Sequence, residues 1–370
     1  MTQWFPVGGD EVCLLRDGAE AFPAMLEAIG GAKNEVLLEM YWIAPDRCGL
    51  RFLDALVAAA RRGVRVRVVY DAVGSMEISP GFWSQVIAAG GEVGSFHAIF
   101  PLRSALTIDI LDGRDHRKIL VIDGYLAFTG GINLARQWLS VEDGGDGWRD
   151  DMIGVRGEAV NELRTIFYET WKKIGNTPPR DLRAIRRRRT RRVWILANPY
   201  RKRRDVRQEY LHRIEFAKTR IDIANSYFVP DRSVRGALIR AAQRGVDVRV
   251  LVPEQGDVPI VQYAVEALFD TLLRSGIKVR ALTDRVLHAK TALIDDDFVT
   301  IGSYNLDERS WRKNLELNVA VEDATFARHV RSWFDHDFEG ARKIELESWR
   351  ERPIARRAAE WIAFGLRRLW

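Results

Sequence analysis

Apolar residues recur with two periods along this chain, and each period predicts one kind of element. Apolar side chains at helical spacing predict a helix over Ala19 to Gly31. Apolar runs predict strands at Glu35 to Trp42 and at Val64 to Asp71, with a helix between them from Leu50 to Arg62. A further helix and a strand in GEVGSF follow. This βαβ order favours an α/β fold with a largely parallel sheet.

The same order of elements recurs in the second half of the chain. The segment RIDIANSYFVPD (220–231) corresponds to EVLLEMYWIAPD (35–46), and AAQRGVDVRVLVPE (241–254) corresponds to AARRGVRVRVVYD. Internal duplication explains this better than two unrelated domains do. We therefore expect two α/β/α halves with mixed, mostly parallel sheets. The halves should pack about a pseudo-twofold axis, with the active site between them.

The duplication predicts four segments: an N-terminal half at 1–175, a basic linker at 176–200, a C-terminal half at 201–345 and a terminal helix at 346–370. Arginine and lysine gather in and beside the linker, in two clusters: Arg183, Arg186, Arg187, Arg188, Arg189, Arg191 and Arg192, then Arg201, Lys202, Arg203, Arg204 and Arg207. These clusters fit either a solvated linker or contact with phosphates of lipid or nucleic acid.

The terminal segment IARRAAEWIAFGLRRLW (354–370) is amphipathic. Helical spacing places five small or apolar residues on one face: Ala358, Trp361, Ile362, Gly365 and Leu369. Charged residues lie opposite, at Arg356, Glu360 and Arg367. Such a helix suits a membrane interface, and docking on the protein core is the alternative.

Composition narrows the class of protein. The 370 residues are 47% hydrophobic and 29% charged, which indicates a globular chain. The formal charge of +6 favours an anionic partner, and nucleic acid and an anionic membrane fit it equally well. The two cysteines, Cys13 and Cys48, form no metal-ligand pattern and suit a reducing compartment. No signal peptide is recognised and no apolar run reaches about 18 residues, so we expect no membrane span.

One pattern of polar residues occurs twice. DHRKILVIDGYLAFTGGIN (115–133) and LHAKTALIDDDFVTIGSYN (287–305) each contain His-x-Lys, then Asp, a small pair and Asn in the same register. The members are His116, Lys118, Asp123, Gly130, Gly131 and Asn133, and His288, Lys290, Asp295, Gly302, Ser303 and Asn305. Chance does not readily produce five positions in register, so the pattern indicates a site built from both copies.

These residue types suit phosphodiester transfer without a metal or cofactor. One imidazole attacks phosphorus, while the other protonates the departing alkoxide and later deprotonates the incoming alcohol. Lys118 and Lys290 are expected to stabilise charge on the phosphate oxygens. Phosphate binding is also expected from Asn133, Asn305, Gly131 and Ser303, through side-chain or backbone donors. A metal site fits poorly, because a lysine lies between the candidate ligands.

Carboxylates complete the expected site. Each imidazole needs an orienting partner, and the candidates are Glu316 in the second half and Asp150 in the first, with Asp151 as the next choice. Asp123 and Asp295 belong to the catalytic motif. They are expected to brace loops through salt bridges rather than to touch substrate.

These residues resemble the phospholipase D superfamily, whose signature is H-x-K-x4-D followed by G-[GS]-x-N. The stretch GSYNLDERSWRKNLELN (302–318), together with WRDD and SYFVPD, also looks like bacterial cardiolipin synthases. The resemblance implies a phosphohistidine intermediate, with His116 as nucleophile and His288 as acid and base. The reaction that it implies joins two phosphatidylglycerol molecules and releases glycerol.

The resemblance also sets expectations for partners and location. Many members begin with two transmembrane helices, which are not recognised here, so the chain is similar to the shorter branch. Peripheral binding to anionic phospholipid at the cytoplasmic face of the bacterial inner membrane is then expected, through the basic linker and the terminal helix. No nucleic acid is expected. Two alternatives remain open: a phospholipase D that uses water as acceptor, and a nuclease on the same scaffold.

Overall fold

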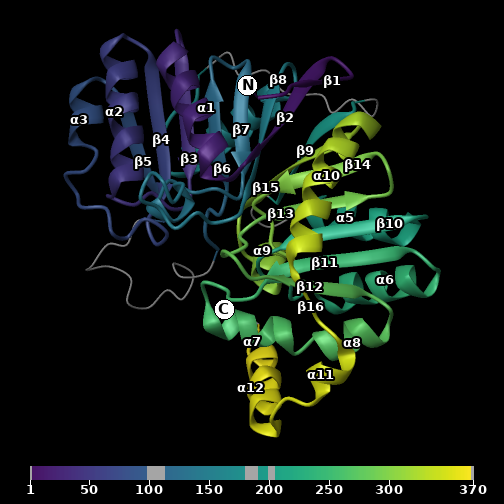
Figure 1. Ribbon diagram of the computed structural model, residues 1–370. Helices are drawn as coiled ribbons and strands as arrows, with labels where there is room; N and C mark the ends of the chain where they lie inside the picture. The colour runs from purple at the N-terminus through teal and green to yellow at the C-terminus, as the bar shows by residue number, and fades with distance from the viewer. Residues whose placement is uncertain (1, 98–112, 180–190, 199–204, 368–370) are drawn as a thin grey trace.

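Two eight-stranded sheets organise the protein (Figure 1). The computed structural model describes residues 2–97, 113–179, 191–198 and 205–367. Each half of the chain supplies one sheet, and both sheets have the same order of corresponding strands. The predicted duplication of an α/β unit is confirmed.

The first sheet has the order β1-β2-β8-β7-β6-β3-β4-β5. Its strands are β1 (Phe5–Val7), β2 (Asp10–Arg16), β3 (Glu35–Met40), β4 (Arg65–Asp71), β5 (Glu92–Phe96), β6 (Lys118–Ile122), β7 (Leu126–Gly130) and β8 (Asp151–Arg156). Within this sheet β3, β4 and β5 are parallel neighbours, as the βαβ rhythm predicts. The remaining pairs are antiparallel.

The second sheet has the order β16-β12-β11-β10-β13-β14-β15-β9. Its strands are β9 (Val193–Asn198), β10 (Arg220–Asn225), β11 (Asp247–Pro253), β12 (Lys278–Leu282), β13 (Lys290–Ile294), β14 (Phe298–Gly302), β15 (Glu316–Glu322) and β16 (Arg342–Lys343). Again only β10, β11 and β12 are parallel neighbours among the described strands. The sheets are therefore mixed but mostly antiparallel, which corrects the expected strand direction. The reason is that each motif strand returns through a tight hairpin instead of a helical crossover.

Helices cover both sheets. They are α1 (Asp17–Gly31), α2 (Arg47–Arg61), α3 (Ser84–Ala88), α4 (Val160–Lys173), α5 (Asp205–Phe216), α6 (Arg232–Gln243), α7 (Pro259–Glu266), α8 (Phe269–Arg274), α9 (Glu308–Arg312), α10 (Ala324–Gly340), α11 (Leu346–Arg350) and α12 (Ile354–Gly365), with a short 3₁₀ helix, η2 (Arg136–Trp138). The helices predicted from apolar spacing correspond to α1 and α2.

One apolar core is shared by the two halves. It contains Ile153 and Val155 of β8 together with Leu317 and Val319 of β15, all of them buried. Helices α4 and α10 add Phe167 and other aromatic and aliphatic side chains to the same cluster. Because the sheets meet through this core, the motif strands β6 and β13 are brought toward each other.

The segment expected to be a basic linker is partly structured. β9 lies inside 176–200 and forms an edge strand of the second sheet, because its run VWILAN is apolar. Arg191 is paired with Glu158 and Glu162, at 3.0 and 2.9 Å. Most of the other arginines of the two clusters lie outside the described residues.

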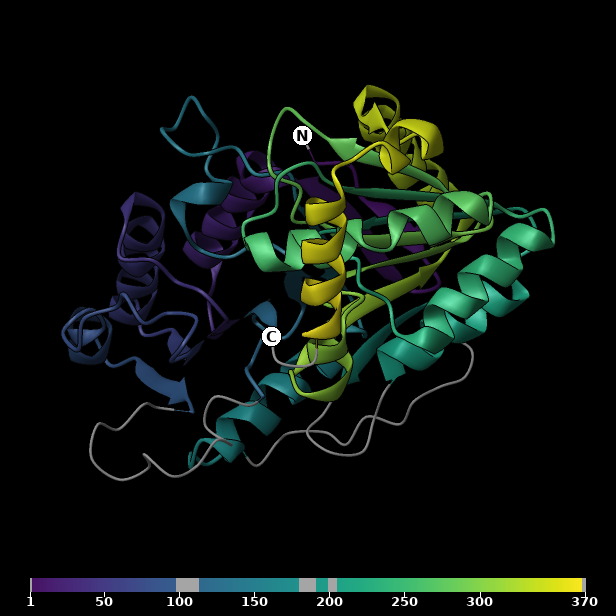
Figure 2. The same cartoon turned by 90° about the horizontal axis from the view of Figure 1, so that it is seen from below.

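The terminal helix α12 packs beside α7 (Figure 2). Ala363 and Phe364 are buried, whereas Trp361 and Ile362 of the predicted apolar face are 55% and 64% exposed. The predicted charged face is instead turned inward at Glu360, which is 1% exposed and accepts a hydrogen bond of 2.6 Å from Arg352. Among the described residues, every helix is too short or too polar to span a bilayer.

Candidate active site

The two motif histidines immediately precede the central strands of their sheets. His116 lies two residues before Lys118, the first residue of β6, and His288 has the same relation to Lys290 of β13. Both imidazoles are nearly buried, with side chains 12% and 7% exposed. The duplicated pattern is thus used at equivalent places in the two halves.

Each imidazole is paired with a carboxylate from the other half of the chain. Nδ1 of His116 lies 3.0 Å from Glu316, and Nδ1 of His288 lies 2.7 Å from Asp150. The sequence identified both carboxylates, but it gave no indication that the pairs cross between the halves. Nε2 of each imidazole has no hydrogen-bond partner among the described residues, and a carboxylate that accepts from Nδ1–H fixes the orientation of the ring.

Backbone bridges between the halves explain the crossing. The amide of His116 donates to the carbonyl of Leu315, the residue before Glu316, at 3.0 Å. The amide of His288 donates to the carbonyl of Arg149, the residue before Asp150, at 2.7 Å. Each motif is therefore held in register with the carboxylate strand of the opposite half. Neither imidazole would be oriented in an isolated half.

Both motif lysines are buried beside the histidines. Lys118 donates to the carbonyl of His116 at 2.7 Å and lies 5.0 Å from the ring centre of Tyr41. Lys290 donates to the carbonyl of His288 and, at 2.9 Å, to Oγ of Ser226. Burial lowers the pKa of Lys118 to about 7 and that of Lys290 to about 8, against the opposing attraction of nearby carboxylates.

The four basic side chains act on one another electrostatically. Burial lowers the pKa of His116, and Lys118 and Lys290 lower it further while Glu316 opposes them. Burial and Lys290 lower the pKa of His288 well below its usual value, with contributions from Lys118 and His116. Together with the crossed hydrogen bonds, these effects indicate that the two motif copies lie close to each other, and a cluster of four basic side chains favours an anion.

The two motif asparagines present amide donors to this pocket. Oδ1 of Asn305 accepts from Oγ of Ser226 at 2.9 Å, and Oδ1 of Asn133 accepts from the amide of Trp42 at 3.2 Å. These contacts fix the orientation of each side chain. Nδ2 of each asparagine has no hydrogen-bond partner among the described residues, so it is available to an anion.

Gly131 and Ser303, which were expected to bind phosphate, both form hydrogen bonds within the protein framework. The amide of Gly131 donates to the carbonyl of Asp151 at 3.0 Å, and Ser303 donates through Oγ to Glu316 at 2.5 Å. A Cβ atom at Gly131 would lie 2.2 Å from Oδ1 of Asp150. A small residue is needed there because the orienting carboxylate packs directly on the backbone.

Asp123 and Asp295 brace loops, as expected, but they do so through backbone amides rather than salt bridges. Asp123 accepts from the amides of residues 33 to 35 at 2.7 to 2.9 Å. Asp295 accepts from the corresponding amides at 218 to 220. Both residues have positive φ in a hairpin turn. They fix the far end of the motif strands, so their place in the catalytic motif is structural.

Several residues near the histidines were not singled out from the sequence. Tyr41 stacks edge-on against His116 at 4.8 Å between ring centres, and Trp138 does the same to His288 at 5.2 Å. Trp138 also donates from Nε1 to Asp150 at 2.9 Å. The alignment of the two repeats places Tyr41 opposite Ser226, at the ends of β3 and β10. This correspondence could have identified Tyr41 as a site residue from the sequence, because β3 and β10 are the strands next to the motif strands β6 and β13.

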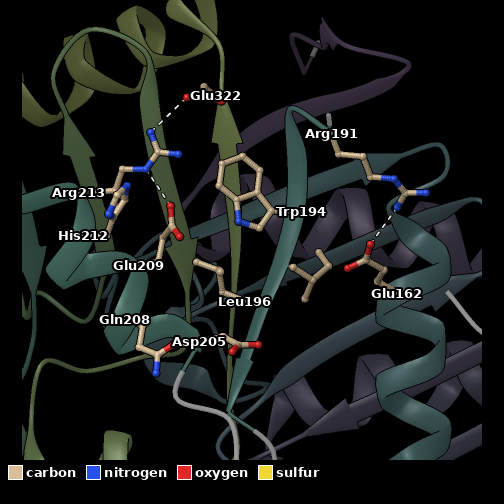
Figure 3. Close-up of a pocket in the computed structure, with 11 residues that line it drawn as sticks. Glu162, Arg191, Trp194, Leu196, Asp205, Gln208, Glu209, His212, Arg213 and Glu322 are labelled. Atoms are coloured by element: carbon tan, nitrogen blue, oxygen red, sulfur yellow. Dashed lines mark hydrogen bonds and ion pairs between the residues drawn. The ribbon is translucent and has the colours of Figure 1, made fainter. Parts of the chain in front are cut away.

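A cavity of about 810 Å³ lies apart from this pocket, beside β9 and α5 (Figure 3). Trp194 lines it, and Arg213 pairs there with Glu209 and Glu322 at 2.8 and 3.2 Å. The described residues that line it include no motif residue. In the described ranges no group of three or more His, Cys, Asp or Glu side chains is arranged to hold a metal ion.

Comparisons with known proteins agree with this arrangement. The family described as cardiolipin synthase, PLD-like domain, matches residues 25–171 and 210–338. The chain is 33% identical to cardiolipin synthase 2 of Bacillus anthracis, over 95% of this chain and 69% of that protein. It is also 33% identical to cardiolipin synthase of Geobacillus kaustophilus, over 95% of this chain and 71% of that protein.

A solved structure shares the fold. The phosphatidylserine synthase of Haemophilus influenzae Rd KW20 aligns with a TM-score of 0.70 and 14% identity, over 96% of this chain and 93% of that one. The doubled domain match and the relatives spanning nearly the whole chain lead to one conclusion: this chain belongs to the cardiolipin synthase family of proteins with phospholipase D-like domains.

Proposed function

We propose that this protein is a phosphatidyltransferase that makes cardiolipin from two phosphatidylglycerol molecules through a phosphohistidine. The observation that carries the proposal is the pair of imidazoles, each backed by a carboxylate from the opposite half, beside two buried lysines. Family membership supplies the substrate class.

In the first step Nε2 of His116 attacks the phosphorus of the donor phosphatidylglycerol. The phosphorus–oxygen bond to glycerol breaks, and His288 transfers its Nε2 proton to the departing oxygen. The choice of His116 as nucleophile follows the resemblance to the superfamily. Lys118 and Lys290, with Nδ2 of Asn133 and Asn305, stabilise the negative charge on the non-bridging oxygens.

In the second step the hydroxyl of another phosphatidylglycerol gives its proton to Nε2 of His288. Its oxygen bonds to phosphorus while the bond to His116 breaks, and the electron pair returns to the imidazole. The free histidines are regenerated and cardiolipin is released.

The lipid is reached from the membrane surface by peripheral binding, at the cytoplasmic face. Exposed apolar side chains on α12 and α7 support this: Ile354, Trp361 and Ile362, with Ile260 and Tyr263. Arg356 and Arg357 lie exposed on the same terminal helix. Apolar groups that enter the interface, flanked by arginines that attract anionic headgroups, are typical of interfacial helices.

The test uses the purified chain with phosphatidylglycerol vesicles and, in parallel, labelled single-stranded DNA, with products followed by mass spectrometry. Cardiolipin and glycerol are expected, and His116→Ala should abolish both. Phosphatidic acid as sole product would mean that water is the acceptor. Cut DNA together with unchanged lipid would contradict the proposal and indicate that the protein is a nuclease.

A second arm examines the intermediate. Donor labelled with ³²P should leave acid-labile label on the protein, and His288→Ala should retain that label longer because deprotonation of the acceptor is lost. A chain that makes cardiolipin at the full rate with His116→Ala would contradict the proposed nucleophile.

A further inference from the structure

A tyrosine and an aspartate stand beside the active site without a part in the steps above. Tyr227 lies just after β10 and follows Ser226, the residue whose hydroxyl accepts from Lys290. Its phenol donates to Oδ2 of Asp257 at 2.8 Å. Asp257 belongs to the loop that joins β11 to α7, and it is exposed.

The carboxylate of Asp257 acts on the catalytic groups of the second half. Burial lowers the pKa of both His288 and Lys290, and the negative charge of Asp257 opposes this lowering at each of them. The hydrogen bonds give the same position: Tyr227 holds Asp257 at 2.8 Å, and the preceding residue in the chain, Ser226, accepts from Lys290 at 2.9 Å, so Asp257 lies on the side of the site formed by the second half. Burial, reinforced by Asp257, raises the pKa of Tyr227, which therefore remains a phenol that donates a hydrogen bond.

Asp257 has unused capacity to accept hydrogen bonds. Its Oδ2 accepts from Tyr227, whereas Oδ1 has no partner among the described residues. A carboxylate offers about four lone-pair sites, so most of them remain free. A carboxylate with free lone pairs suits the hydroxyls of a glycerol moiety, which donate hydrogen bonds to it.

We propose that Asp257 and Tyr227 bind the diol of the glycerol headgroup. The inference rests on the proposed function. In that function, glycerol leaves from the side of phosphorus where His288 acts, and the headgroup of the second phosphatidylglycerol enters on the same side. Because the leaving and entering oxygens share this side, one subsite receives both groups. Asp257 accepts from the two other hydroxyls of the departing glycerol; in the acceptor headgroup it accepts from the hydroxyl that does not react, while the reacting hydroxyl gives its proton to His288.

This subsite also favours transfer over hydrolysis. Water lacks the second hydroxyl and gains nothing from a diol site, whereas glycerol and phosphatidylglycerol are held with one hydroxyl close to phosphorus. The loop that carries Asp257 leads directly into α7, which packs against α12 (Figure 1). Asp257 is thus two residues before the helix whose exposed side chains are proposed to face the membrane.

The experiment compares two soluble acceptors on the full chain. Phosphatidylglycerol vesicles are mixed with equal concentrations of deuterated glycerol and 1-propanol, and labelled phosphatidylglycerol and phosphatidylpropanol are counted by mass spectrometry. The wild-type protein should prefer glycerol by about tenfold or more, the effect of losing a hydrogen bond to a charged group. Asp257→Asn and Tyr227→Phe should each reduce this ratio toward one.

Asp54→Asn is the matched control, since Asp54 is exposed on α2 in the other half and should leave the ratio unchanged. A glycerol preference that survives in both active-site variants overturns the inference, as does a uniform loss of both products at constant ratio. A wild-type chain that makes cardiolipin without preferring glycerol also overturns it. If the wild-type protein formed no lipid product at all, the proposed function itself would be contradicted, and the inference about Asp257 and Tyr227 would fall with it.

Discussion

At the scale of single residues, burial of positive charge makes this pocket reactive toward anions. Two lysines and two histidines share a nearly dry space, and burial lowers the pKa of all four. A phosphodiester that enters brings negative charge close to these groups and raises their pKa values. Binding energy is thereby coupled to protonation of the groups that stabilise the transition state.

The lowered lysine pKa values predict how anion binding depends on pH. An ammonium is charged below its pKa and neutral above it, so affinity should fall as pH rises from about 7 to about 9, through the values of Lys118 and Lys290. Tungstate is a suitable tetrahedral probe because its charge is constant over this range, and calorimetry gives its affinity. Lys118→Met should weaken binding at pH 6.5 and flatten the profile, whereas Lys278→Met, at an exposed position on β12, should not. Affinity that rises with pH would contradict the role of the lysines.

The crossed carboxylate predicts a specific change in the pH–rate profile. Glu316 raises the pKa of His116 against the effect of burial, so Glu316→Gln should shift the acid limb of kcat/KM to lower pH. The rate should also fall by about 10²–10⁴-fold, because the imidazole loses its orienting acceptor. Glu322→Gln, on the same strand but paired with Arg213, should leave both unchanged. If Asp150→Asn rather than Glu316→Gln moved the acid limb, the pairing would run within the halves instead.

At the scale of elements, the spacing of apolar residues predicted those helices and strands whose formation depends on their own sequence. The helices α1 and α2 and the strands β3 and β4 follow from apolar spacing alone. The antiparallel return of the motif strand was also readable, because Asp123-Gly124 is a dipeptide typical of tight hairpins and both residues have positive φ. The βαβ rhythm elsewhere outweighed that signal. The crossed carboxylates were not readable, since they depend on how the two halves meet.

Close packing between neighbouring strands gives a prediction at the same scale. In Gly131→Ala the added Cβ would lie 2.2 Å from Oδ1 of Asp150, so the carboxylate must move away from His288. We expect at least about a tenfold loss of turnover, as for a small misplacement of a catalytic group. Gly30→Ala is the control: it lies in α1 with open space around it, and it should stabilise the protein by about 0.4–1 kcal/mol without loss of rate. Unchanged turnover in Gly131→Ala would show that Asp150 does not orient the imidazole.

At the scale of the whole molecule, the halves are joined by buried charge as well as by the shared core. Arg149 donates to Asp151 of its own half at 2.6 Å and to Asp337 of α10 at 2.7 Å. Arg16 reaches the same Asp337 at 2.7 Å. Arg149 also carries the carbonyl that accepts from the amide of His288. The charges that unite the halves thus lie beside the backbone bridge that sets the catalytic register.

Removal of this charge should therefore cost stability and activity together. Arg149→Met leaves two buried carboxylates without their shared cation, which costs about 3–5 kcal/mol in the free energy of unfolding. Arg136→Met removes only an exposed pair with Asp146 and should cost less than about 1 kcal/mol. Urea unfolding of both variants measures the difference. A cost for Arg149→Met no larger than that of the control would contradict a role for the buried network in joining the halves.

The loss of unfolding free energy in Arg149→Met should also depend on pH, and it should become smaller in acid. Burial alone would raise the pKa of Asp337, but Arg149 and Arg16 outweigh burial and lower it below its usual value. The stability that this pairing contributes is then fully present above the unfolded-state pKa of about 4 and is lost as pH falls through the lowered folded-state value. The gap between wild type and Arg149→Met should therefore be largest near neutral pH and should narrow in acid. A gap that widened as pH fell would mean that Asp337 is held by the fold in its protonated form, and that Arg149 joins the halves by packing instead of by charge.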